Sequence, residues 1–205
     1  MDTDRTQTMQ TTNVRLILGA VLLIAGFYAL ASFSWAWWGL FIGGGLAWLI
    51  AFQRDSKLAF SRPRKLWLIP VGAIVYLVTA TLTGLLASAI GFDWAANPGV
   101  GHLNQLIFML PFMLMGEELL GIGILEGLRS KGLSFLLSSL ISALIFGLMH
   151  VFSYWDGSVF STVAHVLLLQ GVARLIFNYV YLKMGRSIWG SWLTHLLVDL
   201  IALAR

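Results

Sequence analysis

Two adjacent glutamates, Glu117 and Glu118, lie within one of the most apolar stretches of the chain. Residues 109–115 before them are apolar, and so are the two leucines that follow. Adjacent helical residues point about 100° apart, so the two carboxylates can have different partners. A carboxylate in apolar surroundings beside a second one is suited to proton transfer near neutral pH. A pair at a helix end, reaching the lipid headgroups, is the alternative interpretation.

His195 and Asp199 are four residues apart, which places them on one face of a helix. Asp199 could orient His195, or both could hold a metal ion or a water. His150 follows Phe146 at the same spacing on another apolar segment. The sequence contains no H-E-x-x-H pair of histidines, so a metal site would need ligands from three helices.

A second polar stripe consists of Gln170, Arg174 and Asn178, again at four-residue steps. Because an arginine at bilayer depth avoids lipid, we expect Arg174 to face the interior of the protein. Glu118 is then a candidate partner for an ion pair. A polar stripe that only lines a helix contact is an equally good interpretation of these residues.

The composition indicates where such residues must be held. Of the 205 residues, 59% are hydrophobic and 11% are charged, and the mean hydropathy is +0.85. A soluble domain has about 25% charged residues, so the composition excludes a water-soluble globule. The apolar runs are continuous rather than alternating, which favours an all-α polytopic transmembrane bundle over a membrane β-barrel. The chain has no cysteine, which excludes disulfides and thiolate chemistry.

A spanning helix needs about 20 apolar residues. Seven runs of about that length are expected to span the membrane, at 15–33, 35–53, 66–91, 103–126, 133–152, 158–182 and 187–204. With a cytoplasmic N-terminus, the inside segments contain 11 of the 13 basic residues: Arg5, Arg15, Arg54, Lys57, Arg62, Arg64, Lys65, Arg129, Lys131, Lys183 and Arg186. This distribution follows the positive-inside rule. The pI of about 9.7 therefore reports topology, and no nucleic-acid partner is expected.

We expect a flexible polar tail over 1–14 and a single integral membrane domain over 15–205. Ala29-Leu30-Ala31 matches a signal-peptidase site, but another apolar run follows at once, so the first run is interpreted as an uncleaved span. The depth of each residue in the membrane follows from its distance along the expected span, at about 1.5 Å per residue. By this measure His150 lies about half a bilayer away from Glu117 and His195. A tilted helix, a kink at Pro111 or an earlier start of the fifth helix would have to close that gap.

Three motifs in order resemble the CPBP family of type II CAAX prenyl endopeptidases and Abi bacteriocin-processing and self-immunity proteins. They are Glu117-Glu118-Leu119-Leu120-Gly121-Ile122 for Glu-Glu-x-x-x-Arg, Phe146-Gly147-Leu148-Met149-His150 for Phe-x-x-x-His, and His195-Leu196-Leu197-Val198-Asp199 for His-x-x-x-Asn/Asp. The resemblance covers about residues 103–203. One departure is clear: Ile122 replaces the motif arginine, and Gly121 replaces the aromatic residue usually before it. Either Arg174 substitutes for that arginine, or the site is altered.

The resemblance implies an intramembrane endopeptidase. Glu117 would activate water, His150 would help to hold it, and His195 with Asp199 would stabilise the oxyanion; Glu118 completes the catalytic set, with Arg174 and Phe146 in support. Zn²⁺ bound by Glu117, His150 and His195 and a metal-independent glutamate mechanism are equally compatible with these residues.

The expected partners are the lipid bilayer and a membrane-associated peptide or protein substrate, and the expected location is a bacterial cytoplasmic membrane. The alternative within the family is a non-catalytic bacteriocin-immunity or scaffold protein. A proton-coupled transporter is less favoured, because the two halves of the chain show no matching repeat.

Overall fold

The computed structural model describes residues 8–204, and in that range it contains helices and turns but no strand. The predicted all-helical class is thus confirmed, and each of the seven apolar runs contains a helix. The α-helices are α1 (Asn13–Ser32), α2 (Gly39–Phe52), α3 (Ser56–Ala59), α4 (Leu68–Ala89), α5 (Leu103–Leu106), α6 (Leu110–Ser130), α7 (Phe135–Leu148), α8 (Val159–Val166), α9 (Val172–Lys183) and α10 (Ile188–Leu203). Short 3₁₀ turns cover Ser34–Ala36 and Gln53–Asp55, and a π-helical turn, η4 (Leu167–Gly171), joins α8 to α9.

Three of the described helices are long and apolar enough to cross a membrane: Asn13–Ser32, Leu68–Ala89 and the continuous Val159–Lys183. Helices α7 and α10 are apolar but have only 14 and 16 residues. The apolar helices indicate an integral membrane protein. Seven spans were predicted, but only three of the described helices are long and apolar enough to establish a span by themselves. Arg5, which the charge analysis used, lies outside the described residues.

The helices begin where the local sequence satisfies their first N–H groups. The side chains of Thr12, Ser134 and Ser158 cap α1, α7 and α8 by accepting from a backbone N–H three residues further on. The predicted continuous span 103–126 is wrong in its first part, because the chain turns after α5 and begins α6 at Leu110. Pro111 lies in the first turn of α6, where its missing N–H costs nothing and its fixed φ favours a helix start.

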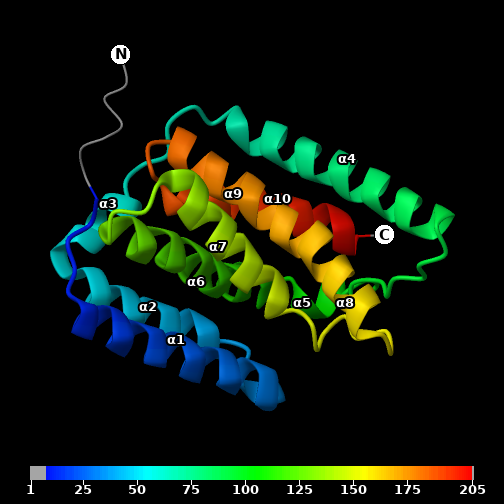
Figure 1. The fold of residues 1–205 in the computed structure, drawn as a ribbon, viewed down its shortest axis with the longest axis horizontal. Coiled ribbons are helices and arrows are strands. Elements are labelled where there is room, and N and C mark those ends of the chain that lie inside the picture. The colour runs from blue at the N-terminus through cyan, green and yellow to red at the C-terminus, as the bar shows by residue number, and fades with distance from the viewer. Residues whose placement is uncertain (1–7, 205) are drawn as a thin grey trace.

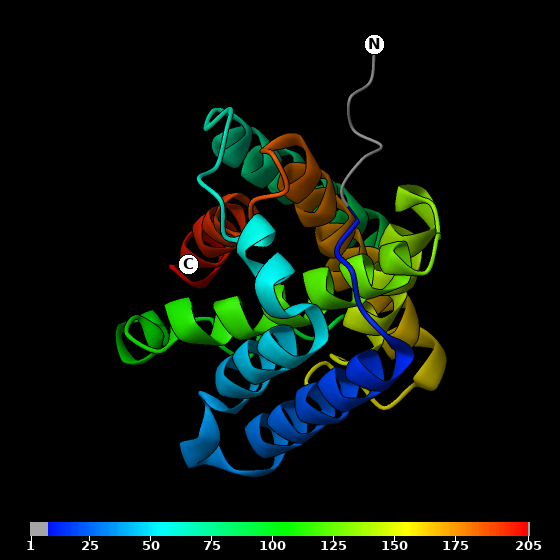
Figure 2. The same ribbon diagram turned by 90° about the vertical axis from the view of Figure 1, so that its left-hand side faces the viewer.

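The helices pack as a series of neighbours, which Figures 1 and 2 show from two sides. Helices α1 and α2 form a hairpin, α2 packs on α6, α6 on α7, and α9, α10 and α4 lie beyond them. Glycines allow the closest contact: a Cβ at Gly26 would lie 2.7 Å from the carbonyl oxygen of Gly39. The hairpin is attached to α6 by a buried hydrogen bond of 2.8 Å from Trp48 Nε1 to the Leu119 carbonyl.

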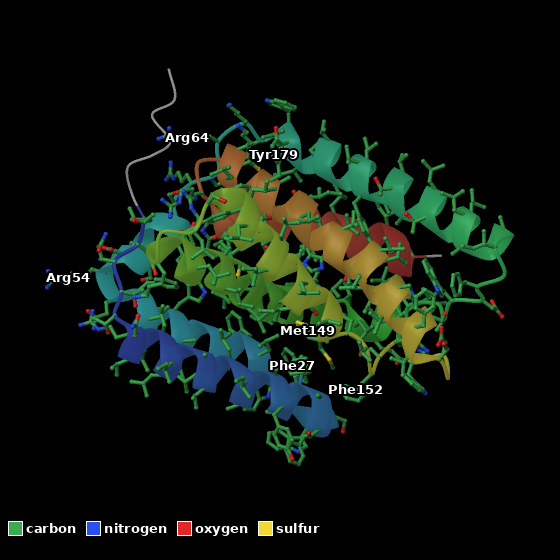
Figure 3. All side chains as sticks on the ribbon, viewed as in Figure 1. Phe27, Arg54, Arg64, Met149, Phe152 and Tyr179 are labelled. Carbon is green, nitrogen blue, oxygen red and sulfur yellow. The ribbon has the colours of Figure 1, made fainter. Side chains whose placement is uncertain are left out.

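Loops distant in sequence meet at one end of the bundle. Gln10 N donates to Asp55 Oδ2 at 2.8 Å, and Lys131 Nζ donates to the carbonyl of Thr11 at 3.2 Å. At the same end Arg64 N donates to the Met184 carbonyl at 3.0 Å. These contacts link the four segments predicted to be cytoplasmic, and Figure 3 shows Arg54 and Arg64, well apart, on the same side of the bundle.

Other contacts define the opposite end. Trp94, in the loop after α4, stacks on His165 of α8 with ring centroids 4.8 Å apart. Phe92 of the same loop contacts Phe160, with centroids 6.1 Å apart. Of the predicted tail 1–14, residues 1–7 lie outside the described part, whereas Met9 is buried in the cluster that contains Trp48.

Candidate active site

The hairpin of α6 and α7 brings Glu117 and His150 together. Glu117 precedes the last residue of α6, Ser130, by 13 residues, and His150 follows the first residue of α7, Phe135, by 15 residues. At 1.5 Å per residue both lie about 20 Å from the turn that joins the two helices. His150 Nε2 is 4.0 Å from Glu117 Oε2. The predicted gap of half a bilayer is wrong, because α6 begins at Leu110 rather than at residue 103.

Helix α10 adds His195 and Asp199 to the same place. His195 Nε2 lies 3.9 Å from Glu117 Oε2 and 3.9 Å from Asp199 Oδ1. An ion pair joins Arg186, in the turn before α10, to Glu126 of α6. Nine residues separate Glu126 from Glu117, and nine separate Arg186 from His195, so the two helices reach the site at the same depth.

Glu118 is fully buried and accepts four hydrogen bonds. Arg174 binds it in a bidentate manner, with Nη1 and Nη2 each 2.9 Å from one carboxylate oxygen. Ser191 Oγ donates at 2.5 Å, and His195 Nδ1 lies at 3.0 Å. The predicted pairing of Arg174 with Glu118 is confirmed. These four contacts occupy both carboxylate oxygens of Glu118, and Glu118 is not among the residues that line the neighbouring pocket.

These contacts fix which histidine nitrogens face Glu117. An ionised Glu118 is only an acceptor, so His195 Nδ1 carries a proton and Nε2 is directed toward Glu117. His150 Nδ1 is 2.8 Å from the carbonyl oxygen of Phe146, which also requires a proton on Nδ1. The side chains of Glu117 and His150 are 17% and 18% exposed, so both can be reached from outside.

Arg174 is held from every side. Phe146 and Phe177 each have their ring centroid 5.4 Å from its guanidinium carbon. Arg174 Nε donates to Asn178 Oδ1 at 3.0 Å. A Cβ at Gly121 would lie only 2.7 Å from Arg174 Cδ and Nη1, so the guanidinium occupies space that a side chain at position 121 would fill. Ile122, where the family motif has arginine, is fully buried in the apolar cluster with Trp48.

A pocket of about 260 Å³ opens beside this cluster. Glu117, His150, His195 and Asp199 all line it, together with apolar side chains from α5, α6 and α10. The sequence analysis missed several polar lining residues, which come from α4, the loop before α5 and the turn after α7: Tyr76, Asn97, Ser153 and Tyr154. No pattern in the sequence marks Tyr76 or Asn97, because each stands alone on its own segment. Ser153 and Tyr154 follow His150 by three and four residues, and this spacing could have indicated them.

The separations at the site do not fit a zinc ion. Two ligand atoms of a tetrahedral zinc lie about 3.4 Å apart, since each bond is about 2.0–2.2 Å long. The separations from Glu117 to the two histidines are 3.9 and 4.0 Å. Within residues 8–204, no group of three His, Asp or Glu side chains is arranged to hold a metal ion. We therefore assign no step of the reaction to a metal.

A second buried acid, Glu126, lies on α6 two and a half turns after Glu117. It is fully buried, and Tyr181 Oη donates to it at 3.0 Å. Arg186 donates through Nε at 3.2 Å and also through Nη2. Burial alone would lower the pKa of Arg186, but the Glu126 carboxylate outweighs it and raises that pKa. The sequence analysis missed this cluster, because the predicted span ended at residue 126.

Comparison with known proteins was made against families, curated proteins and solved structures. No curated protein and no solved structure matches the chain. A family model described as type II CAAX prenyl endopeptidase Rce1-like matches residues 99–201. The match contains all five candidate catalytic residues and leaves out α1, α2 and α4. Since it covers half of the chain, the resemblance seen in the three motifs is confirmed, and the protein belongs to the Rce1-like family of type II CAAX prenyl endopeptidases.

Proposed function

We propose that this protein is an intramembrane endopeptidase that hydrolyses a peptide bond in a membrane-associated peptide or protein. The observation that carries the proposal is the position of Glu117. Its Oε2 lies within 4.0 Å of Nε2 of both His150 and His195, in a pocket that is open to a substrate. Membership of a family of membrane proteases supports the same reaction class.

The proposed nucleophile is a water molecule between Glu117 and His150. The gap of 4.0 Å is too long for a direct hydrogen bond, but one water can reach both atoms. In the neutral form of His150 with its proton on Nδ1, Nε2 is an acceptor, so the water can donate one O–H to it and the other to Glu117. Glu117 then takes a proton as general base, and the new hydroxide forms a C–O bond to the scissile carbonyl carbon.

His195 is the proposed oxyanion donor. Its Nδ1–H is already given to Glu118, so donation from Nε2 requires a proton on both nitrogens. The carboxylates of Glu117, Glu118 and Asp199 lie around the ring and are the countercharges for that form. Asp199 orients the ring in this scheme. As the tetrahedral intermediate collapses, the C–N bond breaks and Glu117 passes its proton to the leaving amine.

Arg174 and Glu118 are the proposed positioning pair. Arg174 brings to Glu118 the positive charge that Ile122 lacks, although it comes from α9 instead of α6. Glu118 in turn holds the ring of His195. This arrangement supports a working site despite the altered first motif, and it argues against the non-catalytic alternative.

The test is cleavage of two probes by purified protein, with and without chelator. One probe is a peptide whose S-farnesylated cysteine is fourth from its C-terminus, and the other is an unprenylated peptide with a membrane anchor. We expect Glu117→Gln to lower kcat at least a thousandfold, as loss of the general base requires. Asp93→Asn, which changes an exposed carboxyl in the loop after α4, serves as the control and cleaves normally. Unchanged cleavage by Glu117→Gln would indicate a non-catalytic binding role.

We further infer that seven helical segments cross the membrane, that the N-terminus is cytoplasmic, and that the compartment is a bacterial cytoplasmic membrane. The clustering of basic loops at one end of the bundle supports the orientation. The absence of cysteine allows single thiols to be placed without background. In sealed cells, an impermeant thiol reagent is expected to label Asp93→Cys and to spare Arg54→Cys; the reverse pattern contradicts the orientation.

A further inference from the structure

Tyr76 places a hydroxyl group near the middle of an apolar membrane helix. It belongs to α4, about 12 Å along the axis from Leu68 and about 20 Å from Ala89, at 1.5 Å per residue. Tyrosines that anchor a protein at the membrane surface lie near the ends of a span, so the position of Tyr76 needs another explanation. Its side chain lines the active-site pocket, together with Glu117 and Asp199.

The packing of α4 directs Tyr76 toward the catalytic groups. Helix α4 lies along α9 and α10 (Figure 1). One turn before Tyr76, on the same face, a Cβ at Gly72 would lie 3.0 Å from Thr194 Cγ2 of α10, so the two helices come close there. The ring centroid of Tyr76 lies 6.2 Å from that of Phe177, and the Phe177 centroid lies 4.6 Å from that of His195. The phenol ring is thus held against the residue that packs on the His195 imidazole.

The Tyr76 hydroxyl is unpaired and accessible. It forms no hydrogen bond with another residue of the range 8–204, and it is not one of the atoms there that are both buried and unpaired. Of the described charged side chains, Asp199 has the strongest electrostatic influence on Tyr76, which places the hydroxyl toward the Asp199 side of the pocket. A tyrosine hydroxyl inside a protein usually has a partner, and a phenylalanine would pack in the same way without needing one. The free hydroxyl is therefore suited to a partner that enters the pocket.

The pocket residues of the three motifs offer few donors for an oxyanion. Glu117 and Asp199 only accept hydrogen bonds when they are ionised. His150 binds the water in the proposed reaction, which leaves His195 as the single donor of that set. Oxyanion sites are built from preorganised donors, and tyrosine is one of the side chains they use. A tyrosine hydroxyl has an ordinary pKa of about 10, so at neutral pH it carries the proton that such a donor needs.

We propose that Tyr76 is a catalytic residue, whose hydroxyl donates a hydrogen bond to the scissile carbonyl oxygen and stabilises the oxyanion together with His195. The inference rests on the proposed endopeptidase function and adds a second donor to that site. As hydroxide adds to the carbonyl carbon, the C=O π electrons move to the oxygen; they return when the C–N bond breaks. Tyr76 keeps its proton throughout. Helix α4, which lies outside the matched residues 99–201, thereby becomes part of the active site.

The first test removes the hydroxyl alone. On the farnesylated and the membrane-anchored probes, Tyr76→Phe is expected to lower kcat about a hundredfold, as loss of one oxyanion donor does. KM should change less than about threefold, because the hydrogen bond strengthens only in the transition state. Tyr179→Phe, which removes the hydroxyl of an exposed side chain on α9, is the matched control and cleaves normally. Since the Tyr76 hydroxyl has no partner in the free protein, the thermal unfolding midpoint of Tyr76→Phe should not fall.

The second test changes the acidity of the hydroxyl and keeps its position. Replacing Tyr76 with 3,5-difluorotyrosine gives a more acidic hydroxyl, which can donate only while it is protonated. The substituted protein is expected to cleave the probes at neutral pH and to lose kcat on the alkaline side at a lower pH than wild type. A hydroxyl with a merely structural role does not move this alkaline limit.

The possible outcomes separate this inference from the proposed function. If wild type cleaves the probes and Tyr76→Phe has the same kcat, the role of Tyr76 is wrong and the endopeptidase function stands. A raised KM with unchanged kcat would indicate ground-state binding and would also overturn the oxyanion role. The same holds for a pH profile that is identical with tyrosine and difluorotyrosine. Absence of cleavage by wild type contradicts the endopeptidase function and this inference together.

Discussion

Helix α6 carries two buried glutamates, and each pairs with an arginine from a later part of the chain. Glu118 binds Arg174 in two parallel hydrogen bonds, and Glu126 binds Arg186. Both carboxylates are fully buried. They differ in what lies next to them: Glu118 touches His195, which faces a pocket, whereas Glu126 touches Tyr181, which is also fully buried.

The comparison shows that a buried ion pair is not by itself a sign of chemistry. Both pairs satisfy the same physical requirement, since a carboxylate in an apolar interior needs a compensating charge and hydrogen bonds. The pair at Glu126 ties the turn after α9 to α6. The pair at Glu118 does the same for His195 and thereby for the groups that face the pocket. In the proposed reaction, a pair contributes to catalysis only where it orients a group that a substrate can reach.

Removing Arg174 should have the largest effect. Arg174→Leu leaves Glu118 buried without its countercharge, so we expect the free energy of unfolding in detergent to fall by about 3–5 kcal/mol. The histidine ring loses its support as well, so kcat should fall at least a hundredfold. Arg174→Lys keeps the charge but not the bidentate geometry, so its unfolding free energy and kcat should lie between those of wild type and Arg174→Leu. Normal activity in Arg174→Leu would show that the two pairs on α6 are equivalent structural devices.

Removing Arg186 should separate stability from chemistry. Its side chain is 15% exposed, so solvent screens part of the interaction and Arg186→Leu should lower the unfolding free energy by about 2 kcal/mol. Cleavage per folded molecule should stay close to wild type, because the catalytic groups keep their contacts. The comparison is refuted if kcat falls as far as in Arg174→Leu at temperatures where both variants are folded.

A methyl group at position 121 should damage one pair and spare the other. In Gly121→Ala the new Cβ meets Arg174 at about 2.7 Å, so the guanidinium must move. Such overpacking typically costs about 1–3 kcal/mol, and we expect kcat to fall about tenfold with little change in KM. Gly84→Ala, on α4 where a Cβ meets nothing within 4 Å, is the matched control. Equal kinetics in the two variants would show that the position of Arg174 is unimportant.

The smallest effect is expected at Tyr181. Tyr181→Phe removes one hydrogen bond to Glu126 and keeps the ring, so the unfolding free energy should fall by about 1 kcal/mol. Cleavage should be unchanged. A fall in kcat under conditions where Tyr181→Phe is fully folded would mean that the Glu126 cluster affects the active site. The distinction between the two pairs would then need revision.

Some of this arrangement could be predicted from the sequence for clear physical reasons. Apolar runs of spanning length predict helices, and a charged residue inside such a run requires a partner, which led from Arg174 to Glu118. The break before α6 was missed, because Pro111 in a long apolar run is compatible with either a kink or a helix start. Glu126 was missed because helix ends are hard to place within several residues. Tyr76 could not be predicted, since only the packing of helices brings it to the pocket, whereas Tyr154 follows His150 by four residues and could have been included.

The contact between Gly121 and Arg174 also constrains how this lineage can vary. A larger residue at position 121 displaces Arg174, and loss of Arg174 leaves the buried Glu118 without its countercharge. Either single substitution therefore passes through a weakened intermediate, and the effect of one depends on the state of the other. An arginine restored at position 122 would need compensating changes around it, because Ile122 is fully buried. Positions 121 and 174 are therefore expected to be epistatic, so that descendants either keep both Gly121 and Arg174 or exchange both.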